Sequence, residues 1–171
     1  MGQEIERKFL IKELPSGLEG YPKHRIEQGY LNVDPALRVR REDDHYYMTY
    51  KGARSSVPGE IGQAEYNLPL DEASYEHLVE KADGNVIRKT RYILPLNDDA
   101  FEEDYRNAHP ALSGLRIELD VFDAPFDGRV LAEVEFPNEE AARLYRPAAW
   151  FSEDVTGDRR YSNAHMSTEA L

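Results

Sequence analysis

The sequence predicts an α+β protein that is mainly β: an eight-stranded antiparallel barrel, closed on itself, with helices packed outside it. Three observations lead to this prediction. Short segments of alternating apolar and charged residues follow one another along most of the chain, and turn residues separate them as in hairpins. The charges also recur at every second residue, so that they share one face of each strand. About eight such strands in hairpin order suit a closed antiparallel barrel.

The first strand, predicted over residues 1–10, sets the pattern of charges. Its apolar residues alternate with charged ones, so Glu4, Glu6 and Lys8 point to the same face. On one isolated strand, two carboxylates and an ammonium in a row are most simply a solvated polar face. The other predicted strands repeat the arrangement, which calls for a second interpretation.

Seven further strands are predicted from alternation, from β-branched or aromatic residues and from bounding Gly, Pro, Asn and Asp. They cover residues 24–33, 37–41, 45–51, 63–70, 86–96, 115–122 and 130–136. Asp43-Asp44 forms a tight turn that makes the third and fourth strands a hairpin. The Gly, Ser and Pro residues of 52–62 contain no phosphate-loop motif, so this stretch is expected to be a plain loop.

Helices are expected between and after these strands. Asp71 is a candidate N-cap for a helix over 71–81, which has an apolar stripe. Further helices are expected at 99–106, at 139–145 and from 158 onward. The polar segment that contains the first of these three, residues 97–114, is long for a connection between strands and is a candidate lid over one mouth of the barrel.

Length and composition predict one domain over residues 1–171, with 40% hydrophobic and 32% charged residues. The formal net charge of −12 argues against nucleic acid or an anionic membrane as the main partner, because both need a basic surface. It leaves room for a small phosphorylated ligand in a locally basic site. Without cysteine there is no disulfide, thiolate catalysis or cysteine-ligated zinc. No membrane span or signal peptide is recognisable, so a cytoplasmic protein is expected.

Outside the first strand, the acidic and basic residues of this pattern occupy different strands. The acidic ones form pairs at alternate positions, with one further carboxylate alone on its strand: Glu4 and Glu6, Glu118 and Asp120, Glu133 and Glu135, and Glu65. The basic ones in the same pattern are Lys8, Arg38, Arg40, Lys51, Lys89 and Arg91. These faces point either outward to water or inward into the barrel. Solvated faces normally mix neutral polar residues with charges, and like charges placed opposite one another cost stability. The inward orientation is favoured, because a bound divalent metal would neutralise the clustered carboxylates and a bound polyanion would neutralise the clustered basic residues.

Carboxylate oxygens without thiolates or paired histidines indicate a hard ion, Mg²⁺ or Mn²⁺. The five histidines show no zinc-binding spacing, and no G-x-S-x-G motif supports a serine nucleophile. Metal-assisted attack of water on a phosphoanhydride fits this set of charges best.

Glu4-Ile5-Glu6-Arg7-Lys8 resembles the E-x-E-x-K signature of the CYTH superfamily, the triphosphate tunnel metalloenzymes. The resemblance continues in order along nearly the whole chain, through Gln28-Gly29-Tyr30-Leu31, Arg38-Val39-Arg40, Lys51-Gly52, Lys89-Thr90-Arg91-Tyr92, Glu118-Leu119-Asp120-Val121-Phe122, Leu131-Ala132-Glu133-Val134-Glu135, Asp154-Val155-Thr156 and Arg160-Tyr161-Ser162-Asn163. This length makes it far more specific than the signature alone. Relatives often carry two acids on the fifth strand, where this chain has Gln63, Glu65 and Asn67 on one face.

The resemblance implies a barrel open at both ends whose charged lumen binds triphosphate and Mg²⁺ or Mn²⁺. The implied substrate ligands are Lys8, Arg38, Arg40, Lys51, Lys89 and Arg91. The implied metal or water ligands are Glu4, Glu6, Glu118, Asp120, Glu133 and Glu135, with Glu65 secondary. Glu4, Glu6, Lys8, Glu133 and Glu135 are the candidate catalytic residues. Arg160 and Tyr161 either close one end of the lumen or only begin a docking helix.

Known members of the superfamily include inorganic, thiamine and RNA triphosphatases and one class of adenylate cyclase. Six candidate bases and no recognisable nucleoside-binding motif favour hydrolysis of inorganic triphosphate to pyrophosphate and phosphate. A cyclase, a thiamine triphosphatase and a non-catalytic polyphosphate-binding module are the alternatives. The expected partner is a small triphosphate, and the expected state is a monomer or a homodimer.

Overall fold

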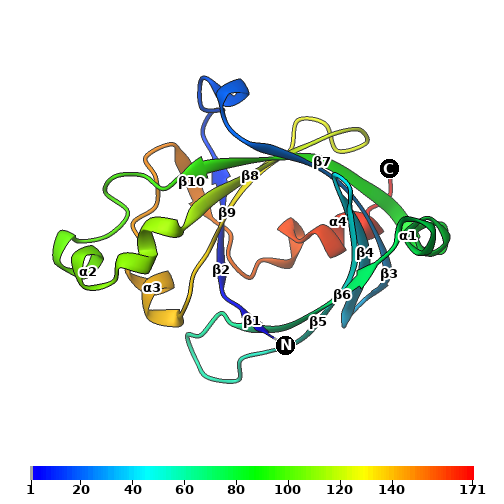
Figure 1. Ribbon diagram of the computed structural model, residues 1–171, viewed down its shortest axis with the longest axis horizontal. Coiled ribbons are helices and arrows are strands. Elements are labelled where there is room, and N and C mark those ends of the chain that lie inside the picture. Colours follow the sequence, from blue (N-terminus) through cyan, green and yellow to red (C-terminus); the bar gives the residue numbers. More distant parts are fainter. Residues whose placement is uncertain (1) are drawn as a thin grey trace.

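The computed structural model describes residues 2–171, and in this range one antiparallel sheet of ten strands curves around a central space (Figure 1). In chain order the strands are β1 Gly2–Glu4, β2 Glu6–Ile11, β3 Lys23–Val33, β4 Ala36–Glu42, β5 His45–Arg54, β6 Gln63–Leu70, β7 Asp83–Pro95, β8 Arg116–Phe122, β9 Val130–Glu135 and β10 Phe151–Asp154. Their order in the sheet is β1-β6-β5-β4-β3-β7-β8-β9-β2-β10.

Short helices connect or follow these strands. The α-helices are α1 Glu72–Val79, α2 Glu103–Ala108, α3 Glu139–Leu144 and α4 Asn163–Thr168, and the 3-10 helices are η1 Leu18–Gly20, η2 Pro110–Gly114 and η3 Arg159–Tyr161. Asp71 caps α1 as predicted, since its side chain accepts a hydrogen bond from the Ser74 backbone nitrogen at 2.7 Å. None of the helices in this range is long and apolar enough to cross a membrane.

The mainly β, antiparallel architecture is confirmed, but the prediction of a closed eight-stranded barrel is wrong. The first strand breaks at Ile5: β1 pairs with β6, whereas β2 pairs with β9. A short strand that the sequence did not predict, β10, then adds to the other edge of β2. The order of paired strands therefore has two ends, β1 and β10, although the strands surround a common interior. Of the predicted first strand, Met1 lies outside the described residues.

The larger hydrophobic core lies on the outside of the sheet, where α2, α3 and β10 cover it (Figure 1). Apolar residues of β2, β7, β8 and β9 supply its inner layer, among them Phe9, Leu94, Leu119 and Val134. The segment 97–114 contributes Phe101 and Leu112 to this core and no residue to the central cavity, so the prediction that it forms a lid is wrong. Burial of its apolar side chains explains the length of this connection.

A second apolar cluster lies inside the curved sheet, at one end of the space. The inward rows of side chains change there from charged to apolar, as from Lys8 to Leu10 and from Lys89 to Ile87. Met166 of α4 is 1% exposed and packs into this cluster, whose other buried members are Tyr30, Ile87, Phe122, Phe126 and Leu131. Helix α4 is therefore an exception to the prediction that the helices pack outside, because it lies across the interior.

Three contacts hold α4 in this position. The amide nitrogen of Asn85 donates to the carbonyl oxygens of Met166 and Glu169, at 3.2 and 2.8 Å. Arg129 forms an ion pair with Glu169 at 2.6 Å. Gly84 has a φ of 69°, and a Cβ atom there would lie 2.0 Å from the carbonyl oxygen of Ser167. Only glycine allows β7 to approach the end of α4 so closely.

On the outer face, Arg7 joins β2 to α3 and β10. Its guanidinium donates to the carbonyl oxygens of Ala142 and Tyr145, at 3.0 and 2.9 Å, near the end of α3. It also forms an ion pair with Asp154 at 2.8 Å. These carbonyl groups have no partner within the helix, so the arginine satisfies acceptors that would otherwise remain unpaired.

We expect Arg7→Met to lower the free energy of unfolding by about 2–4 kcal/mol, because it leaves two carbonyl groups without their donor and removes the cation paired with Asp154. Urea titration followed by circular dichroism measures the change. Arg143→Met, on an exposed face of α3, is the matched control and should change stability by less than about 0.5 kcal/mol. Equal stability of the two variants would contradict this role of Arg7.

Candidate functional site

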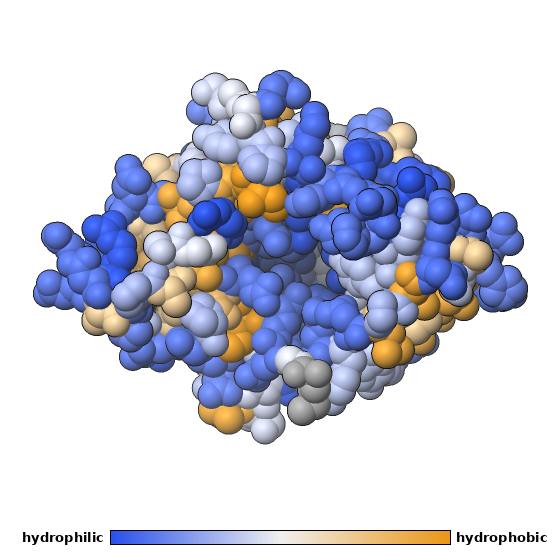
Figure 2. Space-filling model, in the orientation of Figure 1, coloured by the Kyte–Doolittle hydropathy of each residue, from blue (hydrophilic) through white to orange (hydrophobic). Residues whose placement is uncertain are grey.

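A cavity of about 720 Å³ occupies the interior of the curved sheet. Figure 2 shows its opening as a hollow among hydrophilic residues. Of the twelve residues predicted to bind substrate or metal, all but Asp120 line it: Glu4, Glu6, Lys8, Arg38, Arg40, Lys51, Lys89, Arg91, Glu118, Glu133 and Glu135. Glu65 lines it as well. The segregated charges therefore point inward, as the alternation predicted.

One wall of the cavity, formed by β4, carries arginines without acidic partners. Arg40 is buried; its Nε donates to Gln28 Oε1 at 2.7 Å, and its Nη1 donates to the Tyr47 hydroxyl at 3.3 Å. The Nε of Arg38 is buried without a hydrogen-bond partner. Within residues 2–171, no carboxylate lies within 4 Å of either guanidinium. Burial lowers the pKa of Arg40, and Arg38 lowers it further. This wall is therefore suited to an anion.

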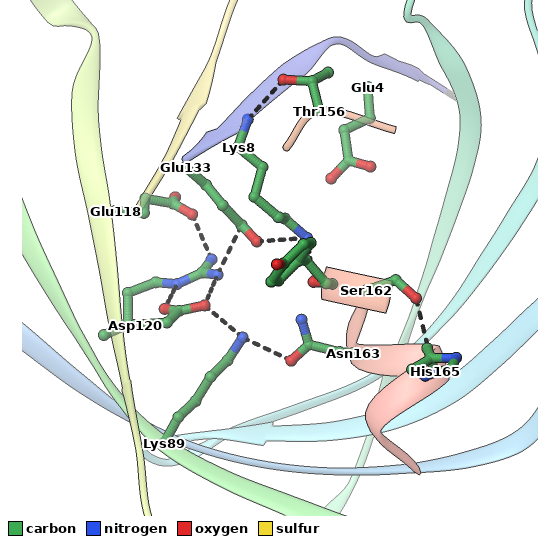
Figure 3. A network of polar contacts seen from close by, with 12 residues as sticks. Glu4, Lys8, Lys89, Glu118, Asp120, Glu133, Thr156, Ser162, Asn163 and His165 are labelled. Atoms are coloured by element: carbon green, nitrogen blue, oxygen red, sulfur yellow. Dashed lines mark hydrogen bonds and ion pairs between the residues drawn. The ribbon is translucent and has the colours of Figure 1, made fainter. Parts of the chain in front are cut away.

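Asp120 lies behind the cavity surface between two cations (Figure 3). Its Oδ2 accepts from Lys89 Nζ at 2.6 Å, and the Arg91 guanidinium binds both of its oxygens at 2.7 and 2.8 Å. Asp120 and Lys89 are both fully buried. Burial alone would raise the pKa of Asp120, but Arg91 and Lys89 lower it, so the carboxylate is ionised. Burial lowers the pKa of Lys89 to about 8, although Asp120 opposes this.

Glu133 lies next to this group, opposite Lys8 in the pairing of β2 with β9. Its carboxylate contacts Lys8 Nζ at 3.1 Å and Arg91 Nη2 at 3.2 Å. Burial would raise the pKa of Glu133, but Lys8 and Arg91 hold it well below its usual value. Lys8 Nζ also donates to the carbonyl oxygen of Tyr161 at 3.3 Å. Neither Tyr161 nor Arg160 lines the cavity, so Tyr161 contacts the site through its backbone alone, and Arg160 is paired with Asp158.

A second ion pair involves Glu4, at the other end of the predicted signature from Lys8. Lys51 Nζ lies 2.5 Å from Glu4 and 3.9 Å from Glu65. Lys8 and Lys51 are therefore each neutralised by a carboxylate from a nearby strand of the sheet.

Other carboxylates in the cavity are poorly compensated. Burial raises the pKa of Glu6 to about 7, and the carboxylates of Glu133 and Glu4 raise it in the same direction. Burial also raises the pKa of Glu135, which is paired across the strands with Glu6, and Glu4 adds to the effect. Burial raises the pKa of Glu118 despite its ion pair with Arg91. A bound cation would relieve this accumulation of negative charge.

The donor set fits a hard divalent cation, because it consists of carboxylate oxygens that are destabilised as anions. In the described range, however, no three acidic or histidine side chains converge closely enough to hold a metal ion. The ion pairs account for this: Glu4 is held by Lys51, Glu118 by Arg91 and Glu133 by Lys8. These side chains would have to turn from their cations to bind a metal.

Several neutral residues of the site were not among the predicted ligands, namely Gln28, Tyr30, Tyr47, Thr156 and Asn163. All except Gln28 line the cavity, and Gln28 bridges Arg40 and Asn163 behind its surface. A search for alternating charges does not find neutral side chains. Gln28, Tyr30, Thr156 and Asn163 do fall within the motifs that carry the resemblance, which was the available signal.

Comparison with known proteins places this chain among relatives of the same length. An inorganic triphosphatase of Nitrosomonas europaea is 36% identical over 168 residues, which are 96% of each chain. An inorganic triphosphatase of Acetivibrio thermocellus is 33% identical over 175 residues, covering 97% of this chain and 94% of the relative.

The solved structure of the inorganic triphosphatase NE1496 is also similar, with a TM-score of 0.65 and 32% sequence identity, over 99% of this chain and 97% of that one. The family model of the CYTH domain matches residues 2–139. The resemblance identified from the sequence is thus confirmed: this chain belongs to the CYTH domain family.

Proposed function

We propose that this chain hydrolyses inorganic triphosphate to pyrophosphate and phosphate in its central cavity, with Mg²⁺ or Mn²⁺ as cofactor. Its relatives from Nitrosomonas europaea and Acetivibrio thermocellus are named inorganic triphosphatases. The observation that carries the proposal is the division of charge inside the cavity. Arginines without acidic partners line one wall, and carboxylates in excess of their cations lie elsewhere.

In this proposal the unpaired arginines of β4 bind the phosphate oxygens first. Arg38 and Arg40 need no rearrangement, since neither is engaged with a carboxylate. Charge-assisted hydrogen bonds from guanidinium groups to phosphate are among the strong ones in proteins. Lys8, Lys51, Lys89 and Arg91 supply the remaining positive charge, which suits the roughly four to five negative charges of triphosphate.

Binding of the polyanion changes the partners of two lysines. Lys8 and Lys51 are paired with Glu133 and Glu4, and phosphate oxygens compete for both ammonium groups. As the lysines turn to the substrate, Glu4 and Glu133 lose their counterions. These carboxylates then become available, with Glu6, Glu118 and Glu135, to hold a metal ion or to orient the attacking water. Substrate and metal would therefore favour each other's binding.

The metal ion, when bound, supplies positive charge that offsets the charge developing on the phosphate oxygens. Asp120 has a different role in this proposal: it holds Lys89 and Arg91 at the cavity wall with both of its oxygens. Water attacks the terminal phosphorus and releases a proton, the bond to the bridging oxygen breaks, and pyrophosphate and phosphate are the products. The arginines and lysines that bind the leaving phosphates stabilise the negative charge that they gain.

We expect inorganic triphosphate to be hydrolysed faster than ATP, because the cavity clamps three phosphates and no nucleoside-binding motif accompanies it. Pyrophosphate, which has one phosphate fewer, should be the poorest of the three. Phosphate release measured over a panel that includes thiamine triphosphate tests this order. Cyclic AMP as the main product from ATP would favour a cyclase instead, and a thiamine triphosphate rate well above the inorganic one would reveal an organic pocket.

Metal dependence is tested separately. EDTA should abolish hydrolysis, because Glu6, Glu118 and Glu135 then face the polyanion without a cation between them. Added Mg²⁺ or Mn²⁺ should restore the rate. Retention of full activity in chelator would remove the metal from the proposal.

Substitutions of basic and of acidic cavity residues should have different effects on triphosphate affinity measured without metal. We expect Arg38→Met to weaken triphosphate binding in EDTA by about tenfold or more, since it removes a charge-assisted contact. Glu135→Gln should bind at least as tightly as the unaltered protein, because it eases repulsion of the polyanion, yet should lose turnover with metal. Isothermal calorimetry measures the affinities. Equal loss of metal-free affinity in both variants would be inconsistent with a divided cavity.

A further inference from the structure

A chain of hydrogen bonds leads from the β4 wall of the cavity to α4. Arg40 Nε donates to Gln28 Oε1 at 2.7 Å, and Gln28 Nε2 donates to Asn163 Oδ1 at 3.1 Å. Lys89 Nζ donates to the same Asn163 oxygen at 3.1 Å and to Asp120 at 2.6 Å. Figure 3 shows the last part of this chain, from Asn163 through Lys89 to Asp120. Asn163 therefore lies between two of the proposed substrate ligands.

The donors at the two ends of the chain fix the orientation of its amides. Arginine and lysine side chains can only donate hydrogen bonds. Arg40 must therefore meet the oxygen of Gln28, which directs the Gln28 nitrogen toward Asn163. Lys89 must likewise meet the oxygen of Asn163. Turning either amide over would place donors against donors, so the assignment of nitrogen and oxygen follows from chemistry.

With its oxygen fixed toward these two donors, the Asn163 side chain has an NH₂ group that donates to no acceptor within residues 2–171. Asn163 is only 7% exposed, it lines the cavity, and both donors that reach it occupy its oxygen. No group of residues 2–171 accepts a hydrogen bond from Nδ2. In Figure 3 the dashed line from Lys89 ends on the oxygen of Asn163, and no dashed line reaches the nitrogen. Arg38 Nε is the one buried polar atom without a partner among the described side chains, so the Asn163 nitrogen is open to the cavity, where a ligand can supply its acceptor.

We propose that Asn163 binds the substrate directly: its Nδ2 donates a hydrogen bond to an oxygen of the triphosphate, beside Lys89 and Arg40. This inference rests on the proposed function, since it concerns the same anion. It makes α4 part of the binding site and not only a support for it. A neutral donor next to these cations adds a directional contact, which places an oxygen rather than merely attracting charge.

The direct test is the side-chain NH₂ signal of Asn163 in a ¹⁵N nuclear magnetic resonance spectrum of the complete chain. Its loss in Asn163→Asp identifies the signal. On saturation with inorganic triphosphate in EDTA, we expect a downfield shift of one proton and slower exchange with water. Asn138, which accepts from the Ala141 nitrogen at 2.8 Å and lies outside the cavity lining, provides the reference signal and should not move.

The triphosphate affinities of two Asn163 variants and one control variant complete the test. Asn163→Asp keeps an oxygen for Lys89 and Gln28, so its melting temperature should be maintained, but it loses the donor and should bind triphosphate about tenfold more weakly or worse. Asn163→Ala removes the donor without adding charge and should also bind more weakly. Asn138→Asp adds the same charge at the start of α3 and can still accept the capping hydrogen bond; its affinity should match that of the unaltered protein.

The outcomes separate the two proposals. If calorimetry shows triphosphate binding while the Asn163 signal stays unchanged and Asn163→Ala binds as tightly as before, the inference is wrong and the proposed function stands. If the unaltered chain neither binds nor hydrolyses triphosphate, the proposed function fails, and the inference fails with it. The spectrum is recorded on the unaltered sequence, so the test holds even if a variant does not fold.

Discussion

The pairing of Asp120 with Lys89 and Arg91 is the interaction on which the cavity depends. Lys89 and Arg91 are buried cations that line the cavity, and the fully buried carboxylate of Asp120 binds both. Breaking a buried ion pair by removing one partner is strongly destabilising, because an uncompensated charge remains. Asp120 therefore makes it possible to keep Lys89 and Arg91 inside the sheet before any substrate arrives. Glu133 extends the same principle to Lys8.

A sheet that fills its interior with charge must find its hydrophobic core elsewhere. The structure solves this by burying the outer faces of β2, β7, β8 and β9 under α2, α3 and β10. The interior keeps one apolar end, where Met166 packs against residues such as Ile87 and Leu131. This end anchors α4, and α4 in turn brings Asn163 to the cavity. The position of the proposed binding residue Asn163 thus depends on hydrophobic burial of Met166, three residues further along the chain.

Much of this arrangement was predictable because side chains alternate along a strand. Glu133 and Glu135 lie on one face whatever the neighbouring strands are, so their inward orientation follows once the other face is apolar. The break at Ile5 was not predictable in this way, since it results from a change of partner strand that leaves the alternation intact. Strand β10 and the path of α4 depend on tertiary contacts, such as those of Arg7 and Asn85. Local sequence pattern contains no information on such contacts. Asn163 was not predicted as a site residue from the charge pattern, because the role of a neutral amide depends on the donors around it in the folded structure.

The ion pairs inside the cavity also explain how such a site can exist without ligands. With a net charge of −12, the chain as a whole repels polyanions, whereas the arginines of the cavity without acidic partners offer them positive charge. Without ligands, Lys8 forms an ion pair with Glu133, and Lys51 forms one with Glu4. In the proposed function, a phosphate replaces the carboxylate in each pair, and a metal ion then replaces the lysine. Arg38 and Arg40 have no such internal partner, so they give the anion its first position. In the proposed function, the unpaired arginines attract the substrate, and the paired lysines couple its arrival to the binding of a metal ion.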